Sequence, residues 1–269
     1  MAGSGSAAAP AVAFDLDGTI YLHEQPLPGA VALVDYLRER RIPYAFATNN
    51  SSTSAARYVE RLRRMDIAVE QDQVITSNHV AADHIRQTGV SKAFIIATPE
   101  VRDEYAAAGL HHDTTAPEAV LLAFDTSLDY GKIAAAAAHL LRGLPYYATH
   151  PDLVCPMPGG PIPDCGAFAA LFEAATGRTP DVLGKPTPAM AATIRRRLST
   201  PGDAPRSVTF VGDRLYTDIR MANENGFTAV LTLTGEAKEA DLAASDYRPD
   251  LVVRGLDELL AHLSAVAIR

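Results

Sequence analysis

The sequence predicts an α/β fold in which helices cover both faces of a parallel sheet. Two observations favour this class. Short apolar runs recur along most of the chain, and stretches with the spacing of amphipathic helices separate them. Most of these runs are continuously apolar, as expected for strands that are buried on both faces of a parallel sheet.

In the first half of the chain, each predicted strand is an apolar run that ends at polar or turn-forming residues. A stretch with helical spacing follows each of them, and the Ala-rich segment KIAAAAAHLL is a good helix former. We expect strands at Val12–Phe14, Tyr44–Ala47, Phe94–Ala97 and Val120–Ala123, and helices at Ala30–Arg40, Ala55–Met65, Val80–Gln87 and Tyr130–Leu141.

The second half continues the same alternation, and no internal repeat is evident. We expect strands at Tyr146–Ala148, Val182–Gly184, Val208–Val211 and Ala229–Leu233, and helices at Phe168–Ala175, Ala189–Leu198, Ile219–Asn225 and Leu256–Leu263.

The composition is that of an ordinary globular protein. The 269 residues are 48% hydrophobic and 21% charged, so the chain can bury one large core or two modest ones. The formal net charge is −8, and no block of Lys or Arg stands out. This balance argues against a dedicated binder of nucleic acid or of membrane surfaces, although it leaves a local basic pocket open.

Two features bear on the cellular setting. The only cysteines, Cys155 and Cys165, lack a metal-ligand spacing and are too few for a disulfide scaffold. The start, MAGSGSAAAPA, has neither a basic region nor a long apolar core, and no stretch approaches the roughly 20 apolar residues of a membrane span. We therefore expect a reduced, cytoplasmic protein that is not inserted in a membrane.

Polar residues follow three of the predicted strands directly. Asp15 and Asp17 follow the first strand, Thr48 and Asn49 follow Tyr44–Ala47, and Asp213 comes shortly after Val208–Val211. In open α/β sheets ligands bind at the carboxyl ends of the strands, so these side chains should converge on one edge. Three acids there need a counter-charge, and carboxylates suit a hard cation, Mg²⁺ above all.

Each motif also has an ordinary interpretation when it is taken alone. Asp-x-Asp-Gly is often a solvated turn, Thr-Asn-Asn-Ser is often a helix cap, and Lys185 in GKPTP could be a surface lysine. Asp213 and Asp218 could likewise be a turn and a cap. All four motifs occur in this order, each at a strand end or a turn, and together they favour a functional site.

These motifs carry a family resemblance that runs nearly from end to end. DLDGT, TNNS, GKP and GDRLYTDI resemble the phosphatase division of the haloacid dehalogenase superfamily. YLHEQPLPGA, YATHPD and PDCGAF resemble its class IIA branch, the p-nitrophenylphosphatase-like and nucleotidase-like enzymes with a large α/β cap. The resemblance implies a Rossmann-like catalytic core of residues 1–79 and 184–269, with an inserted cap of residues 80–183 that governs substrate specificity.

The resemblance implies roles for the acids of the first motif. Asp15 would attack phosphorus and form an aspartyl-phosphate, and Asp17 would protonate the leaving alkoxide and then deprotonate the hydrolytic water. Relatives that hydrolyse carbon–halogen bonds lack the second Asp, so Asp17 favours phosphoryl transfer. Gly18 would permit the sharp turn and Thr19 would tether it, with ordinary turn residues as the alternative for both.

The remaining motifs would bind the metal and the phosphate. Mg²⁺ would be held by Asp15, Asp213 and the backbone carbonyl of Asp17. Lys185, Thr48 and backbone N–H groups around Asn49 would bind phosphoryl oxygens, and Asp218 would orient Lys185 or a metal-bound water.

Two positions in the cap depart from the pattern of the branch. His150 stands where many relatives have the Asn of TNPD, and PDCG at 163–166 replaces a more Gly-rich pattern. We expect His150 and Asp164 to contact the substrate, with scaffolding of the cap loops as the alternative.

The sequence therefore predicts a Mg²⁺-dependent phosphatase of small phosphorylated metabolites, such as sugar, polyol or nucleotide phosphates. A phosphomutase is the nearest alternative enzyme, and a noncatalytic phosphate-binding module is an alternative of another class. No nucleic-acid or membrane partner is expected. The sequence identifies neither the physiological substrate nor the oligomeric state, and a homodimer is one possible state.

Overall fold

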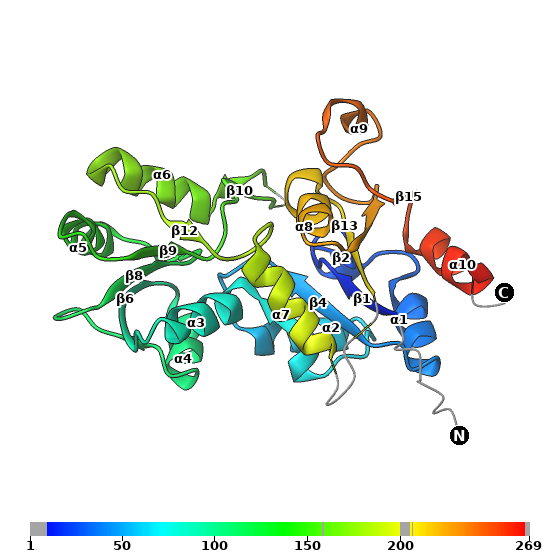
Figure 1. The fold of residues 1–269 in the computed structure, drawn as a ribbon, viewed down its shortest axis with the longest axis horizontal. Coiled ribbons are helices and arrows are strands. Elements are labelled where there is room, and N and C mark those ends of the chain that lie inside the picture. The colour runs from blue at the N-terminus through cyan, green and yellow to red at the C-terminus, as the bar shows by residue number, and fades with distance from the viewer. Residues whose placement is uncertain (1–9, 158, 200–204, 206, 267–269) are drawn as a thin grey trace, which may run out of the picture. The chain divides into compact units, whose positions relative to one another are not determined.

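The computed structural model describes residues 10–157, 159–199, 205 and 207–266. These residues form two compact units. The first contains the described residues of Met1–Ala47, Val59–Ile75 and Ala191–Arg269, and the second contains those of Thr48–Tyr58 and Thr76–Met190. Each unit has its own parallel sheet with flanking helices (Figure 1).

The first unit is built on a sheet in the order β15-β14-β13-β1-β4-β5. From β15 through β4, every neighbouring pair is parallel. The adjacent strands β1 and β4 are buried along their whole length, which accounts for their almost entirely apolar sequences AVAF and YAFAT. The strands are β1 Ala11–Phe14, β4 Tyr44–Thr48, β5 Val74–Thr76, β13 Val208–Gly212, β14 Thr228–Thr232 and β15 Leu251–Val253.

The helices of this unit follow the amphipathic pattern. In α1, Ala30–Glu39, the buried Leu33 and Leu37 lie one turn apart on the same face of the helix. α1 also contacts α10, Leu256–Val266, and the two helices lie side by side in Figure 1. The shorter elements of the unit are the β2–β3 ribbon (Tyr21–Leu22 and Gln25–Pro26), the 3₁₀ turn Gln71–Gln73, the π-helical turn Leu215–Ile219, α8 Arg220–Glu224 and α9 Asp241–Ala244.

The second unit contains a parallel sheet in the order β12-β9-β8-β6-β7. Its core is formed by the apolar side chains of β6, β8 and β9 against α5 and α6, while α3 and α4 lie on the other side of the sheet (Figure 1). The strands are β6 Lys92–Ile96, β7 His111–His112, β8 Ala119–Leu122, β9 Tyr146–Ala148 and β12 Asp181–Val182, with a separate ribbon of β10 Val154–Cys155 and β11 Ile162–Pro163. The helices are α3 Ser77–Gln87, α4 Pro99–Ala107, α5 Tyr130–Leu141 and α6 Cys165–Thr176.

The loop that follows β4 is part of the second unit because its hydrogen bonds go there. The Ser51 hydroxyl lies 2.8 Å from the Thr149 hydroxyl and accepts the backbone N–H of Phe124 at 2.8 Å. The Thr98 hydroxyl donates to the carbonyl of Ser52 at 3.0 Å. The loop thus joins residues at the carboxyl ends of β6, β8 and β9.

The division into units differs in detail from the predicted core and cap. Both place the segment from Val80 to Leu183 in one body, but the second unit also takes Thr48–Tyr58 and continues to Met190. As a result α2, Ala55–Arg64, and α7, Pro188–Leu198, begin among residues of the second unit and end among residues of the first. The assignment of residues 80–183 as a specificity cap stays a prediction.

Several elements differ from their predicted bounds. The predicted strand Val182–Gly184 is shorter in the structure, since β12 ends at Val182. The predicted helix Ile219–Asn225 corresponds to α8, which directly follows the π-helical turn. α4 escaped prediction because it buries only Val101 and Tyr105, which is too weak a periodic signal. The ribbons, β5, β7, α9 and β15 also escaped prediction, since each is two to four residues long.

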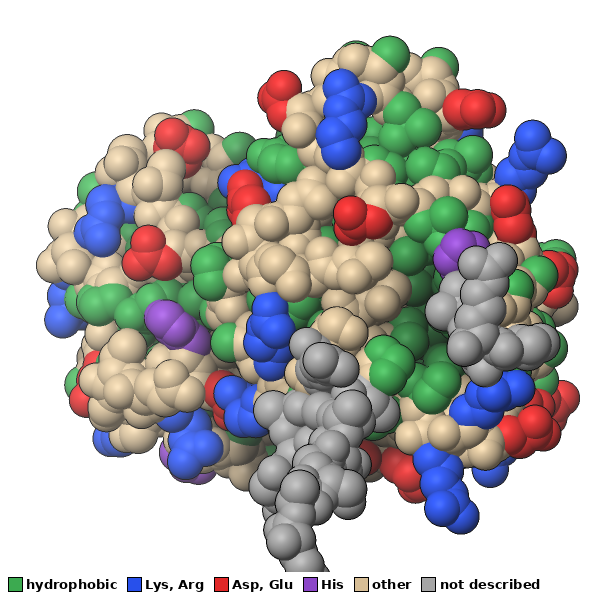
Figure 2. All heavy atoms as spheres, turned by 45° about the vertical axis from the view of Figure 1, so that its right-hand side comes forward, with side chains coloured by type: hydrophobic (Ala, Val, Ile, Leu, Met, Phe, Trp, Pro, Cys, Tyr) green, Lys and Arg blue, Asp and Glu red, His purple; other side chains and the backbone are tan. Residues whose placement is uncertain are grey.

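The described surface carries charges of both signs. On the face drawn in Figure 2, Lys and Arg side chains are interspersed with Asp and Glu side chains, so this face does not present a broad field of one sign. Among the described residues, no helix combines the length and the apolar character needed to cross a bilayer.

Candidate functional site

Three buried carboxylates meet in the first unit. Asp15, Asp213 and Asp218 each offer one carboxylate oxygen, and these oxygens all lie within 4.8 Å of one another. The three residues are 7%, 2% and 0% exposed. Such a cluster of buried acids is costly unless a positive charge compensates it.

Strand pairing brings the acids together. β1 and β13 are parallel neighbours in which Phe14 pairs with Val211, so the residues that follow both strands emerge at the same edge of the sheet. The backbone N–H of Asp15 donates to the carbonyl of Val211 at 2.8 Å and continues the ladder by one residue. Asp218 joins from the π-helical turn, where its Oδ2 accepts the backbone N–H of Arg214 at 3.1 Å.

Glycines leave room for these carboxylates. A Cβ on Gly18 would lie 2.9 Å from the Asp213 carboxyl carbon, and a Cβ on Gly235 would also collide with the Asp213 carboxylate. A Cβ on Gly212 would collide with the side chain of Asp218. Gly18 also has a φ of +83°, which favours glycine for a second reason.

The turn after β1 is held by a residue that the sequence did not indicate. Thr234 donates its hydroxyl to the carbonyl of Gly18 at 2.7 Å, and the N–H of Gly18 donates to the carbonyl of Tyr21 at 2.8 Å. The predicted tether, Thr19, is fully buried, and its hydroxyl makes no hydrogen bond. The prediction for Thr19 was therefore wrong, because the partner comes from the segment after β14, far away in sequence.

Asp17 lies apart from the three clustered carboxylates in its hydrogen bonding. Its Oδ2 accepts the hydroxyl of Tyr21 at 3.2 Å. The Arg61 guanidinium in turn donates to that hydroxyl at 3.5 Å and lies over the Tyr21 ring, 5.6 Å from its centroid. Two carboxylates only one residue apart therefore stand in different environments, which is a prerequisite for different chemical roles.

The acid cluster fits Mg²⁺. Its donors are carboxylate oxygens, which hard cations prefer, and neither His nor Cys takes part. The side-chain set is Asp15, Asp213 and Asp218, whereas the sequence predicted Asp218 outside the ligand shell and assigned the third ligand to the backbone of Asp17. A cation here would compensate the buried negative charge.

In the second unit, Asn49 clamps the backbone of Lys185. Its Oδ1 accepts the N–H of Lys185 at 2.7 Å, and its Nδ2 donates to the carbonyl of Lys185 at 3.0 Å. Lys185 is 2% exposed, although lysine is rarely buried to this degree without an anion. A Cβ on Gly184 would lie 2.6 Å from Asn49 Oδ1, so glycine at 184 permits the close approach.

Thr48 closes β4 and is 3% exposed. Its hydroxyl accepts the backbone N–H of Asn50 at 3.1 Å, an arrangement that shapes the turn after the strand. The structure thus brings the predicted residues Asn49 and Lys185 into contact. The side chain of Thr48 instead contacts the backbone of the turn.

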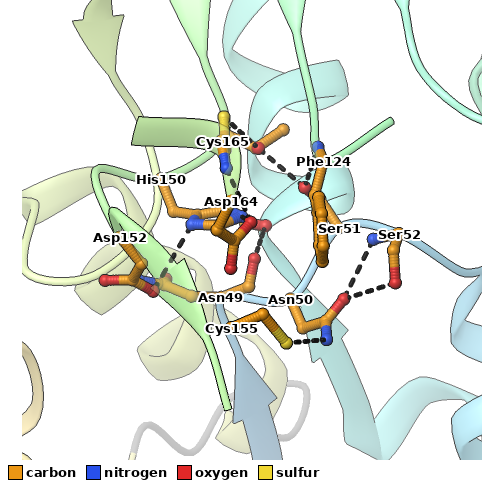
Figure 3. Close-up of polar contacts among 12 residues, drawn as sticks. Asn49, Asn50, Ser51, Ser52, Phe124, His150, Asp152, Cys155, Asp164 and Cys165 are labelled. Carbon is orange, nitrogen blue, oxygen red and sulfur yellow. Dashed lines mark hydrogen bonds and ion pairs between the residues drawn. The ribbon is translucent and has the colours of Figure 1, made fainter. Parts of the chain in front are cut away.

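The predicted cap residues His150 and Asp164 are buried in the second unit, and Figure 3 draws their polar contacts. His150 is 0% exposed, with Nδ1 3.4 Å from Asp152 Oδ2 and Nε2 3.5 Å from Asp164 Oδ1. Asp164 is the N-cap of α6, and its Oδ1 accepts the N–H of Cys165 at 2.6 Å. The sequence had not singled out Asp152, although it follows His150 within THPD.

The cysteines offer no second reactive centre. Cys165 is buried, and burial raises the pKa of its thiol to about 12. The thiol is therefore neutral at physiological pH and a poor nucleophile. Cys155 lies in β10, and neither cysteine forms a disulfide.

Comparison with known proteins identifies the chain's relatives. Residues 12–111 match the family model described as haloacid dehalogenase-like hydrolase, and residues 182–259 match the model for HAD-like hydrolases. Acid sugar phosphatase from Staphylococcus epidermidis is 29% identical over 251 residues, which cover 93% of this chain and 96% of the relative.

Solved structures agree with these matches. The 4-nitrophenylphosphatase from Thermotoga maritima superposes with a TM-score of 0.88 at 38% identity, covering 94% of this chain and 97% of that one. The glycerol phosphate phosphatase from Mycobacterium tuberculosis, solved with calcium, gives a TM-score of 0.85 at 31% identity, covering 93% and 74% of the two chains. The same enzyme has also been solved with magnesium.

Proposed function

The chain belongs to the haloacid dehalogenase-like hydrolase family, in the branch of p-nitrophenylphosphatase-like enzymes with an α/β cap, and we propose that it hydrolyses small phosphomonoesters with Mg²⁺ through a phosphorylated Asp15. One observation carries the proposal. Asp15 stands at the end of β1 among three buried carboxylates whose oxygens lie within 4.8 Å, while Asp17 has its own hydrogen-bond environment. This arrangement supports a metal-bound nucleophile beside a separate acid-base group.

The first step is attack by Asp15. A carboxylate oxygen of Asp15 forms a bond to phosphorus as the bond from phosphorus to the leaving oxygen breaks. Asp15, Asp213 and the Asp17 carbonyl would hold Mg²⁺, with Asp218 in the same acid cluster, and the ion would supply positive charge that lets an anionic carboxylate approach an anionic phosphate.

Asp17 transfers the protons of both steps. In the first step it donates a proton to the leaving alkoxide, which departs as an alcohol. In the second it accepts a proton from water as the water oxygen attacks phosphorus, which releases inorganic phosphate and restores Asp15. Acid-base catalysis of this kind is typically worth about 10²–10⁴-fold in rate.

Lys185, Thr48 and the backbone N–H groups around Asn49 are assigned to the phosphoryl oxygens. Burial supports this assignment for Lys185, since an ammonium group away from water is stabilised by an adjacent anion. The double hydrogen bond from Asn49 holds the backbone of Lys185 in place, so the ammonium group starts from a fixed point.

The substrate class is a small phosphorylated metabolite, with sugar, polyol and nucleotide phosphates as candidates. The relatives support this range, since they include an acid sugar phosphatase and a glycerol phosphate phosphatase. The phosphoryl group is common to all candidates, so the selection among leaving groups must come from residues outside the acid cluster.

Release of inorganic phosphate tests the proposal. The wild type should hydrolyse p-nitrophenyl phosphate with Mg²⁺ and should prefer one class within a panel of phosphorylated metabolites. Asp15→Asn should bind phosphate but lack turnover, because the amide keeps the volume and cannot attack phosphorus. Phosphate binding without release by the wild type would indicate a binding module, and normal turnover by Asp15→Asn would rule out Asp15 as the nucleophile.

A further inference from the structure

The segment that follows β9 contains a buried charged cluster that the proposed reaction does not use. His150, Asp152 and Asp164 are 0%, 6% and 4% exposed, so all three are withdrawn from solvent. Buried carboxylates are costly unless they are paired. His150 lies between the two carboxylates, and its ring contacts both.

Each ring nitrogen of His150 faces one of the two carboxylates. Nδ1 lies 3.4 Å from Asp152 Oδ2, and Nε2 lies 3.5 Å from Asp164 Oδ1. Neither nitrogen makes a hydrogen bond, and each contact is an ion pair only when the ring is protonated. An ionised carboxylate only accepts, and both contacts are therefore attractive only when both ring nitrogens carry hydrogen.

One of the two carboxylates leads to Lys185. Asp152 Oδ2, the atom that faces His150, also accepts Nδ2 of Asn49 at 3.1 Å. The same Nδ2 donates to the carbonyl of Lys185, and Asn49 Oδ1 accepts the N–H of Lys185. A continuous chain of contacts thus runs from His150 through Asp152 and Asn49 to the backbone of Lys185.

The other carboxylate anchors His150 to a rigid element. Asp164 caps α6, a helix of 12 residues, and the N–H of Asp164 donates to the carbonyl of Leu153 at 3.0 Å. The N–H of Gly166 donates to the carbonyl of Asp152 at 2.9 Å. A Cβ on Gly166 would lie 2.7 Å from the carbonyl carbon of Pro151, so the two segments are packed in direct contact.

We propose that His150 is a positioning residue, whose ring holds Asp152 against the start of α6 so that Asp152 and Asn49 fix the backbone of Lys185. This role rests on the proposed function, since it assumes that Lys185 binds the phosphoryl group. It differs from the substrate contact predicted for His150, because a ring with no exposed surface acts through its neighbours. A displaced lysine would weaken every phosphoryl transfer equally, whatever the leaving group.

The test compares two substitutions of His150 on several substrates. His150→Phe keeps an aromatic ring but removes both N–H groups, and should lower kcat for all phosphomonoesters by a common factor of at least about tenfold, with weaker inhibition by inorganic phosphate. His150→Asn can still donate to one carboxylate, and should recover much of the lost kcat. His112→Asn, a histidine replacement elsewhere in the same unit, is the matched control and should leave kcat and KM unchanged.

A second measurement serves in case His150→Phe does not fold. Asp152→Asn keeps the shape but weakens the contact with the ring, and in the double variant with His150→Asn the losses in kcat should be less than additive, because both act on one chain.

Three results would overturn the proposal. They are unchanged kcat in His150→Phe, losses confined to one preferred metabolite while p-nitrophenyl phosphate is unaffected, and fully additive losses in the double variant. Each is distinguishable from failure of the proposed function, which would appear as absence of phosphatase activity in the wild type.

Discussion

At the scale of single residues, two carboxylates that stand one residue apart have acquired separate environments. Asp15 shares a buried cluster with Asp213 and Asp218, whereas Asp17 accepts the hydroxyl of Tyr21. The residue types and their spacing suffice to predict that Asp15 and Asp213 meet, since strand ends converge, but they did not predict that Asp218 joins this cluster in place of Asp17. The roles of Tyr21 and Thr234 could not be predicted, because a single hydroxyl directed at a turn leaves no periodic signal.

The separation of Asp15 from Asp17 leads to a prediction about leaving groups. Asp17→Asn should slow alkyl phosphates much more than p-nitrophenyl phosphate, because p-nitrophenolate departs without protonation. We expect a further loss of about tenfold or more for alkyl substrates, measured as the ratio of kcat/KM values. Tyr21→Phe, which removes the hydroxyl but not the carboxylate, is the control and should give a smaller change of the same kind. Equal losses on both substrates would remove Asp17 as the leaving-group acid.

The clamp on Lys185 leads to a second prediction at this scale. Gly184→Ala would direct a methyl group at Asn49 Oδ1 and at the carbonyl of Thr149, so the clamp must open or the strand end must shift. We expect kcat for p-nitrophenyl phosphate to fall by about tenfold or more. Gly89→Ala is a control for an Ala substitution, since a Cβ there meets nothing within 4 Å, although its φ of +87° adds local strain. Wild-type kcat in Gly184→Ala would show that the lysine does not depend on this contact.

At the scale of elements, the strands that are buried on both faces were the most predictable. β1, β4, β8 and β13 are apolar runs of four or five residues that hydropathy alone locates within one residue. The loop after β4 was predicted as polar, but its attachment to the second unit depends on hydrogen bonds from Ser51 and Ser52 to residues far away in sequence. Sequence patterns report burial and periodicity, and such long-range partners lie outside both.

β7 provides a prediction about stability and pH. His112 Nδ1 accepts the backbone N–H of Ile95 at 2.9 Å, and the ring packs on Phe94 with 5.2 Å between centroids. Burial, followed by the charge of Arg102, lowers the pKa of His112 below its ordinary value of 6.5. The neutral ring is thus favoured in the folded state. Its contribution is present above pH 6.5 and is lost as the pH falls through the lowered pKa.

His112→Asn removes this titration while Oδ1 can still accept the N–H of Ile95. The urea midpoint of the wild type should decrease between pH 7 and pH 5, and the decrease should be smaller in the variant. Part of the dependence should persist, because burial also lowers the pKa of His139. An identical pH dependence in both proteins would show that His112 does not contribute.

At the scale of the whole molecule, the functional residues are distributed over two units that have separate sheets and cores. Asp15, the proposed nucleophile, and its acid cluster belong to the first unit, while Asn49, Lys185 and the His150 cluster belong to the second. The sequence predicted an inserted α/β body correctly in kind, because strands and helices of both units follow the same pattern. It could not show that residues 48–58 cluster with that body, since no boundary signal marks them.

This division leads to a prediction about metal binding. The proposed Mg²⁺ site consists of carboxylates of the first unit that are buried and mutually repulsive, so bound Mg²⁺ should stabilise that unit against unfolding. At a Mg²⁺ concentration of about 100 times Kd, amides of β1 and β13 that exchange through unfolding should exchange about 100-fold more slowly. Amides of β6 and β8 should change little, because they belong to the sheet and core of the other unit.

Asp213→Asn should lose the protection, and excess chelator should reverse it in the wild type together with the activity. Hydrogen exchange followed by mass spectrometry measures all of these changes at once. Equal protection of both sheets would mean that the units unfold together, and protection that persists in Asp213→Asn would place the metal elsewhere.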